Sequence, residues 1–202
     1  MHYRQCRAKI LFKLIIAHKL KIGKFVYGNM NDDRVYLDEN NLRMTTNFRI
    51  NFTRLAEDLI SKGKRDSALA VLDKCVDVMP DKNVPYNYFM TRIAELYYRA
   101  SGAMNPLDST IQRTDVELNK QKQMIEKANS IVSRIVDIYA DNLNYYFSLK
   151  KEPKYYKLVE TDMNQALYIM QALSQTLQQT NQKDLAAKVD KKFKELASQA
   201  GF

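Results

Sequence analysis

The stretch FTRLAEDLISKGKRDSALAVLDKCVDVMP, residues 52–80, decides the fold of this chain. Its first half carries bulky and small residues at helical spacing, at Phe52, Leu55, Ala56 and Leu59. Its second half resumes that spacing after a turn at Gly63, with Ala68 and Leu72, and closes at Pro80. A small residue in each half lets two helices approach closely. The stretch therefore predicts two antiparallel helices joined by a tight turn.

A second, stretched copy of the pattern follows, with Met90, Ile93, Ala94 and Tyr97, then Gly102, then Ala128 and Val132. This is the spacing of tetratricopeptide (TPR) repeats, which are helical pairs of about 34 residues. A third, degenerate pair is expected over residues 155–199, with a turn at Asn181. We predict an all-α fold, a TPR-like array of about three antiparallel helical hairpins. Such arrays present surfaces to partners and rarely carry chemistry.

Local signals place the helix ends. Asp38 is expected to cap a first helix that runs to about Lys62, and a partner helix spans residues 66–78. Pro85 is expected in the first turn of the next helix, which ends near Ala100. The polar run from Thr110 to Lys127 separates the halves of the second pair, and we interpret it as a solvated extension of the following helix.

Composition agrees with a helical fold that buries a substantial core. The chain of 202 residues is 46% hydrophobic and contains only five Gly and four Pro. No alternating β-branched run flanked by hairpin turns is present. Cys75 falls on an apolar helix face, where a lone cysteine behaves as a small hydrophobe.

The net charge of +9 is concentrated at the N-terminus. Residues 1–30 hold seven Lys or Arg and no Asp or Glu, which leaves a net +2 for residues 31–202. Nucleic-acid-binding proteins usually carry their basic excess on the folded domain, so no nucleic-acid partner is predicted. We divide the chain into a basic N-terminal tail or helix, residues 1–30, and a TPR-like helical domain, residues 31–202.

The tail includes the apolar run 10–17, which Lys13 interrupts and which is far shorter than the ~20 residues that span a bilayer. Two interpretations stay open for residues 1–22. The favoured one is a loose or docked terminal helix. The other is a cationic amphipathic helix that contacts a membrane surface.

No constellation of catalytic or metal-binding residues is visible. Residues 31–202 contain no His, which removes the commonest general base and metal ligand. The motifs CxxC and HExxH and a glycine-rich phosphate loop are absent. The acidic group Asp32, Asp33, Asp38 and Glu39 suits a helix start. We therefore predict a protein that is not an enzyme and has no cofactor or metal.

The candidate binding residues follow from the repeat spacing, because the first helix of each pair lines the concave face of such an array. The first two pairs contribute Thr53, Glu57, Thr91, Glu95, Tyr98 and Arg99. The third pair contributes Tyr168, Gln171 and Gln175. Glu57 and Glu95 occupy the same place in successive repeats. Two carboxylates with Tyr98 beside them suit a basic or hydrogen-bond-donating protein or peptide, and an empty solvated groove is the alternative.

Several phrases of the sequence resemble one bacterial family. They are Tyr27–Met30, Val35–Asn40, Leu55–Glu57, Asp73–Cys75, Met79–Pro80, Pro85–Tyr88 and Asn144–Phe147. Together they resemble the soluble C-terminal region of a membrane protein family described as protein O-mannosyltransferase-like, a domain of unknown function. The resemblance covers about residues 24–202. In that family the catalytic machinery belongs to an N-terminal multi-spanning part, so the resemblance implies no transfer activity here. It implies the periplasmic face of the inner membrane, whereas a stand-alone protein would be cytoplasmic.

Three functions are carried forward. The first is a non-catalytic protein-interaction module, as the soluble part of, or a fragment related to, that glycosyltransferase-like membrane protein. The second is a stand-alone soluble peptide-binding adaptor. The third is a small-molecule-binding or enzymatic helical domain that uses tyrosines and carboxylates.

Overall fold

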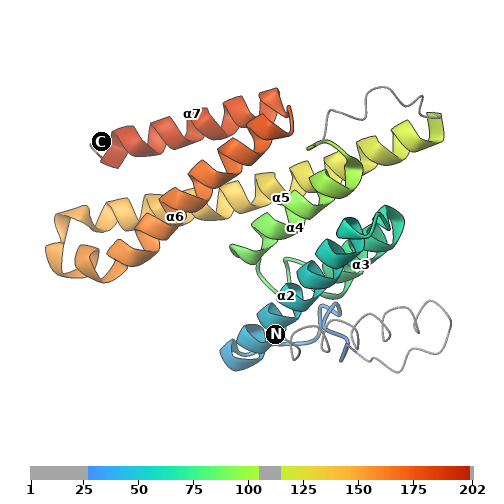
Figure 1. Ribbon diagram of the computed structural model, residues 1–202. Helices are drawn as coiled ribbons and strands as arrows, with labels where there is room; N and C mark the ends of the chain where they lie inside the picture. The colour runs from blue at the N-terminus through green and yellow to red at the C-terminus, as the bar shows by residue number, and fades with distance from the viewer. Residues whose placement is uncertain (1–26, 105–114, 201–202) are drawn as a thin grey trace, which may run out of the picture. The chain divides into compact units, whose positions relative to one another are not determined.

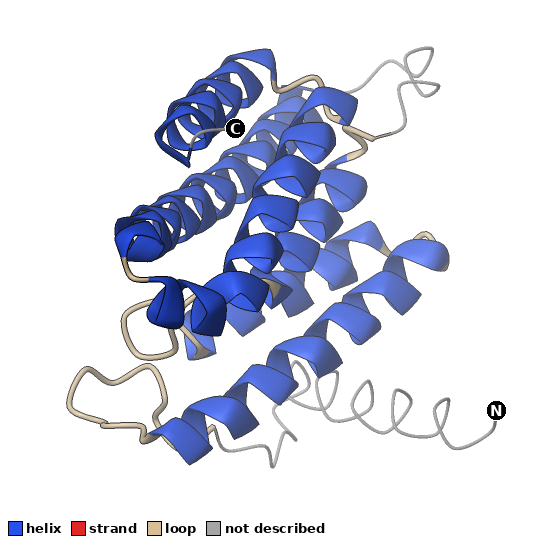
Figure 2. Cartoon of the chain, turned by 90° about the vertical axis from the view of Figure 1, so that its left-hand side faces the viewer, coloured by secondary structure: helices blue, strands red, loops and turns tan. Residues whose placement is uncertain are grey.

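A computed structural model describes residues 27–104 and 115–200 of the chain. The described residues form six α-helices and one 3₁₀ helix. They contain no strand, and Figures 1 and 2 show helices joined by loops and turns. The all-α prediction is confirmed. The chain divides into two compact units at Ser101/Gly102, and each unit is described by itself.

The first helix of unit 1, α2, spans Glu39–Ser61 and has the predicted ends. The Asp38 carboxylate accepts a hydrogen bond of 2.8 Å from the backbone N–H of Asn41, which is an N-cap. Gly63 follows the helix with a φ of 70°, a left-handed conformation that glycine adopts without strain. The chain can therefore reverse at once into the next helix.

Helix α3 spans Arg65–Val78 and α4 spans Phe89–Ser101. Helix α2 packs against both, and α3 also packs against α4 (Figure 1). The small residues Ala56 on α2 and Ala68 on α3 are fully buried, as close helix packing requires. Five residues predicted to be buried in this unit are buried: Phe52, Leu55, Leu72, Ile93 and Tyr97.

Helix α4 begins later than predicted. Pro85 lies before it in the connection, not in its first turn. The Asp81 carboxylate accepts a 2.7 Å hydrogen bond from the backbone N–H of Tyr86, and the Asn87 side-chain oxygen accepts one of 3.2 Å from the N–H of Phe89. These side chains hold residues 81–88 as turns and start the helix at Phe89.

A buried arginine attaches this connection to α2. The side chain of Arg49 has no exposed surface, and its guanidinium donates to three backbone carbonyls. The distances are 3.2 Å to Met79, 2.5 Å to Val84 and 2.9 Å to Pro85. The guanidinium carbon also lies 5.3 Å from the centre of the Tyr86 ring. One α2 side chain thus satisfies carbonyls that no regular helix would satisfy.

The residues that precede α2 pack on the same unit. The side-chain amide of Asn83 donates to the backbone carbonyls of Met30, at 3.0 Å, and Asp32, at 2.7 Å. Lys82 forms an ion pair with Asp33. The ring of Tyr27 stacks on Phe52 with centroids 6.2 Å apart. Residues 27–33 therefore form a strap against the first helical pair.

Unit 2 consists of three long helices. Helix α5 spans Asp115–Ser148, the 3₁₀ helix η2 spans Leu149–Lys151, α6 spans Pro153–Gln179 and α7 spans Lys183–Ala200. Each α-helix packs against the other two. Asn181 makes the predicted turn between α6 and α7 with a φ of 59°. Val132 of the predicted repeat pattern and Ile135, one turn further along α5, have no exposed surface.

The predicted solvated extension is confirmed as far as the structure describes it. Residues 115–127 form the first turns of α5, and their side chains are exposed or half-buried. Thr110 to Thr114, like the tail up to residue 26, lie outside the described residues. Among the helices that the structure describes, none is both long and apolar enough to cross a membrane.

Candidate functional site: interaction surfaces on each unit

The predicted groove residues of unit 1 form a mixed charge cluster. Arg92 of α4, which sequence reasoning did not single out, pairs with Glu57 of α2 and with Glu95 one turn further along α4, the latter at 2.5 Å. Arg99 adds a longer contact of 3.5 Å to Glu57. Two guanidinium groups thus face two carboxylates.

The balance of charge in this cluster decides what it could bind. Partial burial lowers the pKa of Arg92, but the carboxylates of Glu95 and Glu57 together raise it by more than burial lowers it. The pKa of Arg92 therefore lies above its ordinary value. Because both carboxylates already have cationic partners, the wall offers no uncompensated negative charge to a basic ligand. Sequence spacing located the two carboxylates but not Arg92, which pairs with both of them.

Tyr98 requires a second correction. Its side chain is fully buried instead of facing an open groove, and loss of solvent raises its pKa above the ordinary value. Tyr97, its neighbour, is also buried and donates a 2.7 Å hydrogen bond to Asp73. Both tyrosines of the pair are therefore inside, although neighbouring positions on a helix point about 100° apart. Helix α4 buries eight of its 13 residues, a proportion too large for a single apolar stripe.

The two threonines of the predicted groove are occupied locally. The hydroxyl of Thr53, on a largely buried side chain, donates to the Ile50 carbonyl at 2.8 Å. The hydroxyl of Thr91, which is half-buried, donates to the Tyr88 carbonyl at 2.6 Å. Both bonds are made within or next to their own helix, so these hydroxyls contribute little to a partner.

The three candidates of unit 2 lie together on an open surface. Tyr168, Gln171 and Gln175 are all exposed, and their spacing of three and four residues puts them on one face of α6. Tyr168 keeps 71% of its surface exposed. Exposed amides surround them on the same helix: Asn164, Gln165, Gln178 and Gln179. We call these seven residues the outer face of α6.

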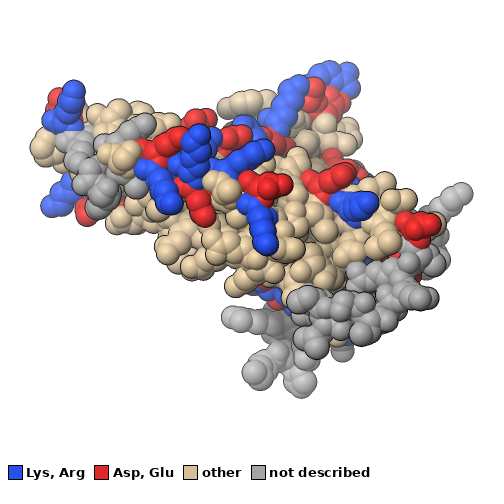
Figure 3. All heavy atoms as spheres, turned by 90° about the horizontal axis from the view of Figure 1, so that it is seen from above, with Lys and Arg blue, Asp and Glu red and all other residues tan. Residues whose placement is uncertain are grey.

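The outer face of α6 carries no charge. Residues 163–182 contain no Asp, Glu, Lys or Arg, whereas charged residues make up 27% of the chain. The contrast is visible on the face drawn in Figure 3, where Lys and Arg are interspersed with Asp and Glu. An uncharged surface of amides and one aromatic ring offers donors, acceptors and apolar area without the cost of desolvating ions.

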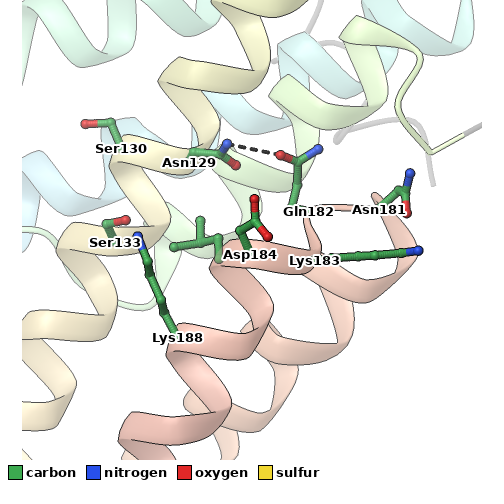
Figure 4. A pocket seen from close by; sticks show the side chains of 9 residues that line it. Asn129, Ser130, Ser133, Asn181, Gln182, Lys183, Asp184 and Lys188 are labelled. Carbon is green, nitrogen blue, oxygen red and sulfur yellow. Dashed lines mark hydrogen bonds between the residues drawn. The ribbon is translucent and has the colours of Figure 1, made fainter.

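A polar cleft of about 570 Å³ lies within unit 2, beside the start of α7. On α5 the cleft is lined by Asn129, Ser130 and Ser133. Asn129 and Ser133 lie opposite Gln182, Asp184 and Lys188, as Figure 4 shows. Asn129 donates a 3.1 Å hydrogen bond to Gln182, and Figure 4 shows Lys188 directed toward Ser133. Sequence reasoning missed this cleft because its two walls are about 50 residues apart and form no motif.

Cys75 is the one cysteine among the described residues, and its thiol is buried. No group of three His, Cys, Asp or Glu side chains among them is placed to hold a metal ion. Burial raises the pKa of the Cys75 thiol to about 12, although Arg49 nearby lowers it. The thiol therefore stays protonated at neutral pH and is a poor nucleophile.

Comparison of the chain with protein-family models, with curated proteins and with solved structures found no match.

Proposed function

We propose that this protein is a non-catalytic interaction module and that the outer face of α6 receives a protein partner. The observation that carries the proposal is the coincidence of an exposed tyrosine with a charge-free helical surface. The centres of protein interfaces are depleted of charged residues and enriched in tyrosine. Residues 163–179 extend for roughly 25 Å along the helix, a span suited to an interface of standard size.

The helical packing supports a repeat-like architecture for this module. In unit 1, α4 packs against both helices of the α2–α3 hairpin. The first helix of the next repeat in a TPR-like array would pack on the preceding hairpin in the same way. We further propose that the chain is related to the soluble region of the O-mannosyltransferase-like membrane family that it resembles, and a stand-alone adaptor is the alternative. An adjacent reading frame that encodes spanning helices would separate the two.

The test is capture of a partner by the purified full chain, with charge introduced into the outer face. Gln171→Lys with Gln175→Lys should abolish retention, because two ammonium groups would have to be desolvated at the interface. The matched control is Asn119→Lys with Gln123→Lys, the same charge change on exposed positions of α5. Equal retention by both double variants would place the binding surface elsewhere.

A second candidate function, binding of a small polar molecule, is favoured by the cleft beside α7. Its volume lies within the range of ordinary ligand sites, and its walls carry hydroxyl, amide and ammonium groups. A screen of polar metabolites by thermal shift would test it. A hit should be lost in Ser133→Leu and kept in Gln171→Lys, whereas a hit kept in Ser133→Leu would exclude the cleft.

A further inference from the structure

The connection between α5 and α6 carries an exposed aromatic and aliphatic surface. Tyr145 is 60% exposed at the end of α5, and Tyr155 and Leu158 are 52% and 73% exposed at the start of α6. The 3₁₀ helix η2 between them packs against both helices, so the connection forms one end of the α5–α6 hairpin (Figure 1). We call residues 145–158 the hairpin tip.

The hairpin tip also concentrates positive charge. Residues 150–157 contain four Lys and one Glu, a net +3, whereas the whole of residues 102–202 carries a net +2. The rest of the unit therefore sums to −1. The entire basic excess of unit 2 lies in eight residues at one end.

The lysines of the tip are available to a ligand. Lys151, Lys154 and Lys157 are exposed, and no carboxylate among the described residues forms an ion pair with them. The ammonium group of Lys154 lies 5.9 Å from the centre of the Tyr155 ring, so a positive charge and an aromatic ring lie side by side on this surface.

We propose that the hairpin tip docks on an anionic lipid surface. Tyrosine rings favour the level of lipid headgroups because they have an apolar body and a polar end. Lysine side chains reach the same level with their charge in water and attract anionic headgroups. Leu158, whose side chain is largely exposed, can enter the boundary of the acyl region. The outer face of α6 takes no part, so this proposal stands independently of the proposed function.

A lipid surface fits the tip better than a nucleic acid does. Proteins that bind single strands combine a basic groove with a series of stacking platforms. The tip is the end of a helical hairpin, and its most exposed large hydrophobic side chain is the aliphatic Leu158, which cannot stack on a base. Its aromatic, aliphatic and cationic side chains on one end match the composition of membrane-interface segments.

The experiment measures binding of the full chain to vesicles of neutral phosphatidylcholine and to vesicles containing 30% phosphatidylglycerol. We expect binding to the anionic vesicles only, weakening as salt rises. The triple change Lys151→Glu, Lys154→Glu and Lys157→Glu should lower that binding by roughly tenfold or more. Tyr155→Ala with Leu158→Ala should lower the part of the binding that survives high salt. Circular dichroism checks that each variant keeps its helices.

The control separates the tip from net charge and from the basic tail at residues 1–30. Lys122→Glu, Lys191→Glu and Lys194→Glu change the same charge on exposed positions outside the tip. This variant should keep most of the binding. Equal loss in both triple variants, unchanged binding in the tip variant, or no binding of the wild-type chain would each overturn the proposal. Binding of a single-stranded oligonucleotide in preference to vesicles would overturn it too. If the glutamate variant loses its helices, the matching Lys→Gln variants decide by the same criterion.

Discussion

At the scale of single residues, Arg49 is the least replaceable polar side chain described in unit 1. Burial lowers the pKa of its guanidinium, while Cys75, Tyr86 and Asp81 raise it in part. No carboxylate forms an ion pair with it among the described residues, and its Nε has no hydrogen-bond partner there. Its charge is balanced by carbonyl dipoles instead of by an anion. The contribution of Arg49 to stability therefore depends on the connection keeping the one conformation in which these carbonyls meet the guanidinium.

Arg49→Met should destabilise the protein by about 2–4 kcal/mol, because it leaves the carbonyls of Met79, Val84 and Pro85 without donors. Chemical denaturation measures the change. Arg54→Met, an exposed arginine on the same helix, should change the free energy of unfolding by less than about 0.5 kcal/mol. Equal effects would show that Arg49 does not hold the connection.

Alkaline pH should destabilise the fold through buried acids. Burial raises the pKa values of Tyr97 and Tyr98 above their ordinary value and that of Cys75 to about 12. A raised folded pKa means that the unfolded chain releases its protons first. Stability is therefore full below about pH 9 and falls as pH rises, by up to about 1.4 kcal/mol per pH unit for each group.

Tyr98→Phe should reduce the slope of unfolding free energy against pH between pH 9.5 and 11. Tyr168→Phe, a change at an exposed tyrosine, should leave the slope unchanged. The comparison uses slopes, so any effect of the substitution on stability at neutral pH cancels. A wild-type stability that stays flat up to pH 11 would contradict the buried titration.

Predictions of burial for single residues failed where burial depended on groups far away in the sequence. Helical spacing places Phe48 on the same face of α2 as Phe52 and Leu55, yet Phe48 is 36% exposed and Arg49 is buried beside it. A charged side chain becomes an acceptable core residue only when acceptors meet it, and those acceptors lie 30 to 36 residues away. No local pattern could have supplied that information.

At the scale of elements, helix ends were predictable because capping is local. Asp38, Gly63 and Asn181 each act within a few residues of their own position, and each acts as expected. The position of Pro85 was predicted wrongly because proline is common in the first turn of a helix, whereas Asp81 and Asn87 fix the turns that determine where α4 starts.

For the candidate site, the exposure of Tyr168, Gln171 and Gln175 on α6 followed from helical periodicity. The burial of Tyr98 could not be predicted in this way. Helix α4 is covered on most of its sides, so its sequence has no clear polar stripe that would mark a solvent-exposed face.

The crossing of α2 and α3 gives a test at this scale. Ala68→Leu should cost roughly 1–3 kcal/mol through overpacking, because Ala68 has no exposed surface at the contact. Ala70→Leu on the same helix, where the side chain is half-buried, should cost less. Melting temperatures measure both. An unchanged melting temperature in the Ala68 variant would mean that the helices can separate without penalty.

At the scale of the whole molecule, the strap of residues 27–33 ties the start of the described chain to unit 1. Deletion of residues 1–22 leaves the strap intact, so the melting temperature should change by less than about 3 °C. Deletion of residues 1–36 removes its contacts with Asn83, Lys82 and Phe52 and should lower the melting temperature by roughly 5 °C or more.

The two deletions are compared by calorimetry on otherwise identical chains. A large loss in the shorter deletion would show that Leu11, Leu14 and Ile15 belong to the core, against the interpretation of the tail as dispensable. Equal melting temperatures in the two deletions would show that the strap adds no stability.

The uncharged outer face of α6 also controls what proteomic chemistry can detect. No Lys or Arg occurs from residue 158 to 182, so trypsin releases this region as one long peptide that ends at Lys183. Amine-reactive crosslinkers, acetylation and ubiquitin attachment have no target inside it. A partner seated on this face would be reported only at the two flanking lysines, Lys157 and Lys183, and a survey based on lysine reactivity would place the contact at the ends of the helix that it covers.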